Sequence, residues 1–198
     1  MNEETLNEVS EENILFEYKT DYSFSYKESN IFSMLLFVSC FLFFVGLFGI
    51  IWGFEHTWVL AEKFIFNVYI TIPVLVIGIF LHEILHAITL IIFAGIKIKH
   101  LKAGINWINF TPYIHCKHPV SVKNYRISTI APALLMGIIP AIFSIFLNSV
   151  YFLFFGIIFI VTSGSDLISL WKIRKTKGDY LASDHSERAG CQVFENPF

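Results

Sequence analysis

The chain has 198 residues, of which 55% are hydrophobic, 17% aromatic and only 15% charged. A soluble domain has about 45–50% apolar and about 25% charged residues, so this composition excludes an ordinary soluble protein and indicates a protein of the lipid bilayer. The net charge of −2 offers no electrostatic basis for a nucleic-acid partner, and none is expected.

Residues 1–30 are predicted to be an acidic cytosolic tail. They carry eight acidic residues against Lys19 and Lys27, whereas a secretory signal begins with basic residues and has a shorter apolar run. No secretory signal is therefore expected. The segment ILFEYKTDYSFSY, residues 14–26, leaves room for a short folded element within this tail.

Four apolar blocks follow, and the predicted fold class is an α-helical polytopic membrane protein with about four transmembrane helices. The blocks cover residues 31–53, 64–95, 127–148 and 149–171. Each can supply the roughly 20 residues that a helix needs to cross the hydrocarbon core. Pro73 lies in the second block, where it would either kink one helix or separate two segments.

The end of the chain is predicted to return to the cytosol. Only Asn148 and Ser149 separate the last two blocks, so these two spans must form a tight hairpin. Residues 172–198 then form a cytosolic C-terminal tail. The whole transmembrane domain is expected to cover residues 31–171.

The loop at residues 95–125, between the second and third spans, is predicted to contain a cytosolic β-hairpin. Apolar and polar residues alternate at its start, and it then turns through Gly104 and two asparagines. Its exposed edge could hold an unwound peptide by strand addition. The alternative is an interfacial hairpin anchored at the lipid headgroups by Trp107 and Tyr113.

The distribution of basic residues predicts the orientation in the cell membrane. With four spans, 13 of the 14 Lys and Arg residues fall on one side and only Lys63 on the other. Lys and Arg are enriched in cytoplasmic loops, so both termini are expected to be cytoplasmic. Cys40 falls in the first span, while Cys116 and Cys191 fall on the cytosolic side, and all three are expected to be reduced structural thiols.

The stretch FLHEILHAI, residues 80–88, places two histidines and a glutamate in a run that is otherwise free of charge. On a helix His82 and His86 are one turn apart and project from nearly the same face. This HExxH pattern offers two imidazoles to one zinc ion and the Glu83 carboxylate to a water molecule as general base. The sequence therefore predicts a catalytic zinc site with Zn²⁺ as cofactor.

An alternative reading of the three residues is an interhelical hydrogen-bonding cluster of the kind that polar residues form in membranes. The motif alone can also arise by chance. A charged side chain at the bilayer centre costs about 2.5–3.5 kcal/mol on insertion scales. Glu83 beside two histidines would be difficult to tolerate there without a compensating cation, which favours the metal site.

Asp166 is the predicted third ligand of the metal. It is the only acidic residue between Glu83 and Asp179, and it would lie at a depth similar to His86 from the same cytosolic side. A catalytic zinc usually has three protein ligands and one open position. The alternative is an Asp at the membrane boundary that pairs with Lys172 or Arg174.

The segment YIHCKH supplies rival ligands for the same metal. Its side chains of ligand type are His115, Cys116 and His118. They are expected in the cytosolic loop rather than in the membrane, which makes Asp166 the preferred third ligand.

HEILH in a membrane helix, followed two spans later by an intramembrane Asp, resembles the site-2 protease type of intramembrane metalloprotease. The chain is more similar still to the small zincin-type peptidases of bacterial membranes, a family of formally unknown function. The shared features run from His82 to about Trp171. The resemblance implies that His82 and His86 bind zinc, that Glu83 is the base and that Asp166 completes the site.

Site-2 proteases also have a Gly-Pro-x-x-Asn segment and a Leu-Asp-Gly segment. The counterparts here are APALL at 131–135 and SDL at 165–167. Leu135 replaces the Asn, and no Gly follows the Asp. These departures fit the smaller family better.

The predicted function is that of a zinc-dependent endopeptidase that hydrolyses a peptide bond of a membrane-associated or transmembrane protein, in or near the bilayer. The alternative class is a non-enzymatic metal-binding membrane protein that serves in transport or sensing, or as an inactive scaffold. Transport would require a polar path across the bilayer, and outside the motif and Asp166 the spans offer mainly Asn67, Asn148 and small hydroxyl groups.

Overall fold

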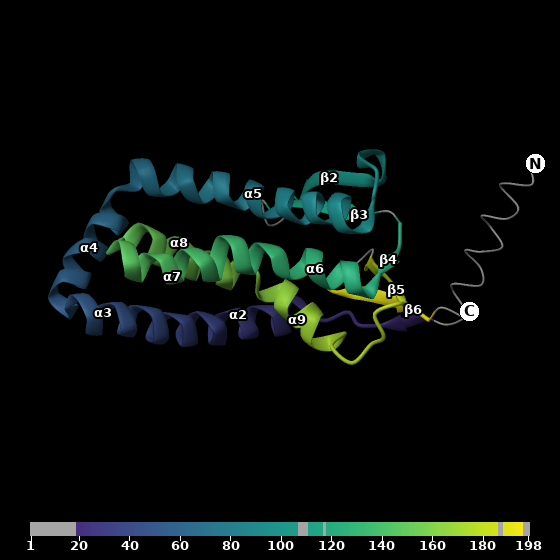
Figure 1. Cartoon of the computed structure of the whole chain (residues 1–198), viewed down its shortest axis with the longest axis horizontal. Helices are drawn as coiled ribbons and strands as arrows, with labels where there is room; N and C mark the ends of the chain where they lie inside the picture. The colour runs from purple at the N-terminus through teal and green to yellow at the C-terminus, as the bar shows by residue number, and fades with distance from the viewer. Residues whose placement is uncertain (1–18, 107–110, 117, 186–187, 196–198) are drawn as a thin grey trace, which may run out of the picture.

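The computed structural model of the chain describes residues 19–106, 111–116, 118–185 and 188–195. A bundle of long helices makes up most of it, and a small β-structure covers one end of that bundle (Figure 1). The first and last described strands pair with each other. The two ends of the described chain therefore lie side by side at one end of the bundle.

The first long helix runs from Tyr26 to Trp52 as α2 (Tyr26–Cys40), a π-helical stretch η1 (Phe41–Val45) and α3 (Gly46–Trp52). It begins at a capping box, in which the Ser25 side chain accepts from the Glu28 N–H and the Glu28 carboxylate accepts from the Ser25 N–H. It ends at Gly53, whose φ of 93° favours glycine. The helix therefore starts five residues before the apolar block itself.

A shorter helix, α4 (Phe54–Phe66), joins the first long helix to the second at the end of the bundle away from the sheet (Figure 1). The second long helix, α5 (Val68–Ala94), continues through Pro73 without a break and ends at Gly95, which has the left-handed φ of 66°. Residues 64–66, which the sequence analysis assigned to the second span, belong to α4.

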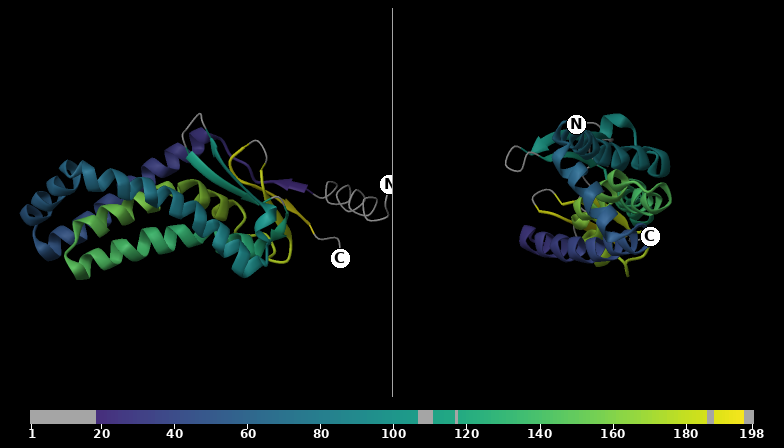
Figure 2. Two further views of the ribbon diagram at one scale, coloured as in Figure 1. Left: turned by 90° about the horizontal axis from the view of Figure 1, so that it is seen from above. Right: turned by 90° about the vertical axis from the view of Figure 1, so that its left-hand side faces the viewer.

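The third long helix consists of α6 (Val122–Pro132), a π-helical stretch η3 (Ala133–Ile138) and α7 (Ile139–Leu147). A turn at Asn148 (φ 48°) leads directly into α8 (Val150–Thr162), which confirms the predicted tight hairpin. After Ser163 the chain bends by 47° into α9 (Gly164–Lys172). In Figure 1 and in the end-on view of Figure 2 (right), α7 and α8 lie between α5 and the α2–α3 helix.

Three of these helices are long and apolar enough to cross a membrane, and there are four spans if α8 and α9 count as one bent span. Their outer surfaces carry large exposed apolar side chains such as Phe43, Tyr69 and Phe146. Such surfaces are suited to lipid rather than to water. The structure thus supports a helical membrane protein, while the side of the membrane on which each end lies stays a prediction.

The predicted hairpin in the loop is present. After a short 3-10 turn η2 (Ile98–His100), strand β2 (Leu101–Asn106) pairs antiparallel with β3 (Thr111–Cys116). The hairpin packs beside α5 through β3 (Figure 2). The turn was expected at Gly104 and at the asparagines 106 and 109, but Gly104 and Asn106 belong to strand β2. Residues 107–110, which include Trp107, lie outside the described residues.

A second, four-stranded antiparallel sheet was not predicted. Its strands, in the order β1-β6-β5-β4, are β1 (Lys19–Asp21), β6 (Cys191–Phe194), β5 (Leu181–Asp184) and β4 (Val120–Ser121). Its buried core contains Ala182, Cys191 and Val193, which pack on Val122 and Ile173 of the helical part. Segments that the sequence analysis treated as tails at both ends of the chain are therefore tied into one sheet.

Candidate metal centre

Helix α5 carries the three motif residues in its second half, which leads toward the β-hairpin. His82 is buried, with 7% of its surface exposed, while Glu83 and His86 are half-buried. The helical spacing of four places both imidazole rings on one side of α5, 5.0 Å apart between ring centroids. The predicted geometry of the motif is therefore present.

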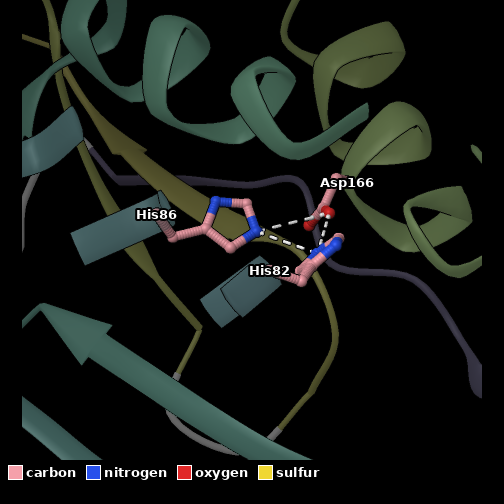
Figure 3. A group of neighbouring side chains, drawn as sticks. All are labelled: His82, His86 and Asp166. Atoms are coloured by element: carbon pink, nitrogen blue, oxygen red, sulfur yellow. Dashed lines mark hydrogen bonds and ion pairs between the residues drawn. The ribbon is translucent and has the colours of Figure 1, made fainter. Parts of the chain in front are cut away.

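Asp166 reaches the two histidines from the first turn of α9. Its Oδ2 lies 3.3 Å from Nε2 of His82 and 3.4 Å from Nε2 of His86, and the two Nε2 atoms are 3.3 Å apart. Figure 3 shows both rings turned toward the carboxylate. One ligand atom from each of the three residues lies within 4.8 Å of the others, so this group could bind a metal ion.

The orientation of the His86 ring is fixed by a hydrogen bond to the neighbouring helix α6. His86 Nδ1 lies 2.9 Å from the carbonyl oxygen of Ser128 in α6. A carbonyl can only accept, so Nδ1 carries the hydrogen and Nε2 of the neutral ring presents its lone pair to the cluster. The Ser128 hydroxyl in turn donates to the His86 carbonyl, and Thr89 donates to that hydroxyl.

His82 is held differently. Its ring lies beside Phe159 of α8, with 6.5 Å between ring centroids. Its Nδ1 is buried and has no hydrogen-bond partner in the described part of the chain. Apart from its Nε2 contacts with Asp166 and His86, the His82 ring is therefore held by packing, whereas the His86 ring is also held by a hydrogen bond to α6.

Glu83 faces the hairpin rather than the three ligand atoms. Its Oε2 accepts a hydrogen bond of 3.1 Å from the backbone N–H of Ile114 in β3. The next outward-facing N–H of the same strand, that of Cys116, donates to Asp184 of β5 at 3.4 Å. The outer edge of β3 is thus held by two acidic side chains.

Two cavities meet at the cluster, and Glu83 and Asp166 line both. The first, of about 220 Å³, extends toward the sheet, where Asp184 accepts a hydrogen bond from Tyr125. The second, of about 350 Å³, extends between the helices toward Phe159. A chain lying through both cavities would pass the cluster and the Glu83 carboxylate.

The structure does not support the surface ion pair considered for Asp166. Lys172 donates to the carbonyl of Ser23, and Arg174 donates to the carbonyl of Trp171 while lying over its ring. Both cations therefore have partners other than Asp166.

The rival ligands are not gathered into a metal-binding group in the part of the chain that the structure describes. The Cys116 thiol lies against the carbonyl of His118, and the His118 ring packs on that of His100. The side chain of His115 lies outside the described residues. Of the predicted ligands, the structure brings together His82, His86 and Asp166.

Sequence reasoning missed the residues that support the cluster. The Ile114 contact is made by a backbone N–H, which leaves no side-chain signal in the sequence. Ser128 contributes a backbone carbonyl, and its nearest sequence signal is a proline four residues later, at position 132.

Comparison with protein families gives one match. Residues 75–181, just over half of the chain, match a family model described as "putative zincin peptidase". No curated protein and no solved structure matches the chain. The matched segment runs from the helix of the HExxH motif through α9, and so contains all three ligand candidates.

Proposed function

The chain belongs to this family of zincin-type peptidases, and from that premise we propose that it is a zinc-dependent endopeptidase embedded in the membrane. The observation that carries the proposal is the convergence of His82, His86 and Asp166 within 4.8 Å, beside Glu83, on helices apolar enough to span a bilayer. We further propose a multi-pass protein of the cell membrane with both termini in the cytoplasm.

The residues fit a zinc ion. Two imidazole nitrogens and one carboxylate oxygen are a ligand set typical of catalytic zinc, and a fourth position stays open for water or substrate. The Ser128 carbonyl holds the His86 hydrogen at Nδ1, which leaves Nε2 free to coordinate. Zinc in such a site supplies Lewis acidity, which polarises a carbonyl and makes water nucleophilic near neutral pH.

In this mechanism Glu83 moves the protons. Its carboxylate takes a proton from water as the water oxygen bonds to the peptide carbonyl carbon. It then returns that proton to the leaving amine as the C–N bond breaks. In the described structure the carboxylate is held by the Ile114 N–H, so this hydrogen bond positions Glu83 at the junction of the two cavities.

We propose that the substrate is a membrane-associated or transmembrane protein whose cleaved segment is unwound, because a helical peptide bond is shielded by its own hydrogen bonds. Strand addition at the outer edge of β3 would require the substrate to take over the N–H groups of Ile114 and Cys116, which now bind Glu83 and Asp184. Substrate binding at this edge would therefore release the catalytic carboxylate.

The test compares the wild type with Glu83→Gln, both purified in detergent. The wild type should hold about one zinc per chain and should release fragments from apolar peptides of about 20 residues, which mass spectrometry would detect. Glu83→Gln should keep the zinc, and the amide oxygen can still accept from Ile114. Its cleavage rate should fall about 10²–10⁴-fold because the general base is removed.

Other outcomes would reject the peptidase. A wild type that binds zinc but cleaves no peptide, with Glu83→Gln indistinguishable from it, would favour the non-enzymatic metal-binding protein. Retention of zinc in both His82→Ala and His86→Ala would move the metal away from the motif.

A further inference from the structure

Pro132 lies in α6, four residues after Ser128, whose backbone carbonyl accepts the hydrogen bond from His86. In a regular helix the N–H of residue 132 would donate to the carbonyl of residue 128. Pro132 lies inside the helix and has no N–H, and a proline ring in a helix clashes with the carbonyl four residues earlier. Directly after Pro132 the helix becomes π-helical, at Ala133–Ile138.

The Ser128 carbonyl released in this way needs another donor. Ser128 is only 4% exposed, and a buried carbonyl without a partner is strongly disfavoured. The donor present in the structure is His86 Nδ1 at 2.9 Å. His86 of α5 therefore supplies to the Ser128 carbonyl the hydrogen bond that Pro132 of α6 cannot donate.

We propose that Pro132 is a positioning residue of the metal site: by withholding its N–H from Ser128, it makes that carbonyl the acceptor that orients His86 toward the metal. The inference rests on the proposed zinc site and deepens it. It assigns a role to a side chain that lines neither of the two cavities at the cluster.

Two other links between α5 and α6 must be separated from this one. The Ser128 hydroxyl donates to the His86 carbonyl, and Thr89 donates to the Ser128 hydroxyl. These side-chain bonds tie the two helices together but do not touch the His86 ring. Ser128→Ala removes them and keeps the backbone carbonyl, so it reports on the helix contact alone.

The experiment measures zinc affinity of the full-length protein in detergent by competition with a chelator of known affinity. In Pro132→Ala the new N–H should donate to the Ser128 carbonyl in place of His86. The zinc dissociation constant should then rise about 10–100-fold, the usual effect of removing the hydrogen-bond partner of a ligating histidine. The thermal unfolding midpoint should stay equal or rise, because alanine is favoured over proline inside a helix.

The matched control is Pro140→Ala. Pro140 lies in the same long helix, at the start of α7 and eight residues after Pro132. This variant should keep zinc affinity close to that of the wild type, and Ser128→Ala should lose less affinity than Pro132→Ala. Cobalt bound in place of zinc provides a second readout, because its visible absorption depends on ligand geometry and should change only in Pro132→Ala.

Wild-type zinc affinity and an unchanged cobalt spectrum in Pro132→Ala would overturn the positioning role while leaving the zinc site intact. Equal losses in Pro132→Ala and Pro140→Ala would also overturn it, since both would then reflect the helix alone. A second substitution, Pro132→Gly, also restores the N–H and must weaken zinc binding as well. A wild type that binds no zinc would instead remove the proposed function and this inference together.

Discussion

The close contact between α7 and α8 predicts a strong effect of one added methyl group at Gly156. A Cβ at this position would lie 2.5 Å from the Ala141 nitrogen and 2.7 Å from the Gly137 oxygen. Ordinary contact begins at 3.4 Å, so the first distance is 0.9 Å too short. Both atoms belong to the backbone of the neighbouring helix and cannot rotate away.

Gly156→Ala should therefore force the two helices apart and lower the free energy of unfolding by about 1–3 kcal/mol, the usual range for overpacking. Helix contacts in a membrane depend on close packing, because lipid is as apolar as the side chains. The assay is unfolding by sodium dodecyl sulfate in mixed micelles, followed by circular dichroism, with the wild type measured in parallel.

Gly46→Ala is the matched control, since a Cβ at this helical position has no atom within 4 Å. It should keep or slightly increase the stability, because alanine is favoured over glycine in a helix by about 0.5–1 kcal/mol. If Gly156→Ala were as stable as Gly46→Ala, the tight α7–α8 contact would be refuted.

Three further predictions concern the metal site, the topology and the thiols. Asp166→Asn should weaken zinc binding as well as cleavage, unlike Glu83→Gln, and Asp166→Ala should abolish both, as measured by metal analysis and peptide cleavage; normal values in Asp166→Ala would exclude this ligand. Tags at residues 2 and 198 should be protected from external protease in intact cells, while a label near His56 should react; accessibility of either tag would reject the four-span topology. Burial, with the nearby Asp184 charge, raises the pKa of the Cys191 thiol to about 12, so it stays protonated at pH 8 and should resist alkylation until the protein is denatured, as mass spectrometry would show.

Much of the helical part could be predicted from the sequence because its signals are local. An apolar block of sufficient length indicates a span, and the four-residue spacing of His82 and His86 places both on one face of a helix whatever surrounds it. Asp166 could be selected as a ligand because it is an isolated acid in an apolar block. Each of these inferences needs only composition and spacing within one segment.

The sheet could not be predicted in the same way. Strand β1 at Lys19–Asp21 pairs with β6 at Cys191–Phe194, and short strands of three or four residues carry little pattern of their own. The paired residues of β1 and β6 are more than 170 residues apart along the chain. Such pairing is stabilised by a core shared with Val122 and Ile173, which exists only once the helices are packed.

The sequence by itself determined which residues are available to hold a metal, because the HExxH spacing and the lone acid are local properties. Only the tertiary structure decided how they meet. Asp166 is 84 residues from His82 and approaches it because the chain bends by 47° after α8. The Ser128 carbonyl and the Ile114 N–H are backbone groups that do not depend on the type of side chain, so the sequence does not reveal their role. The packing of α6 and β3 against α5 brings them to the motif residues.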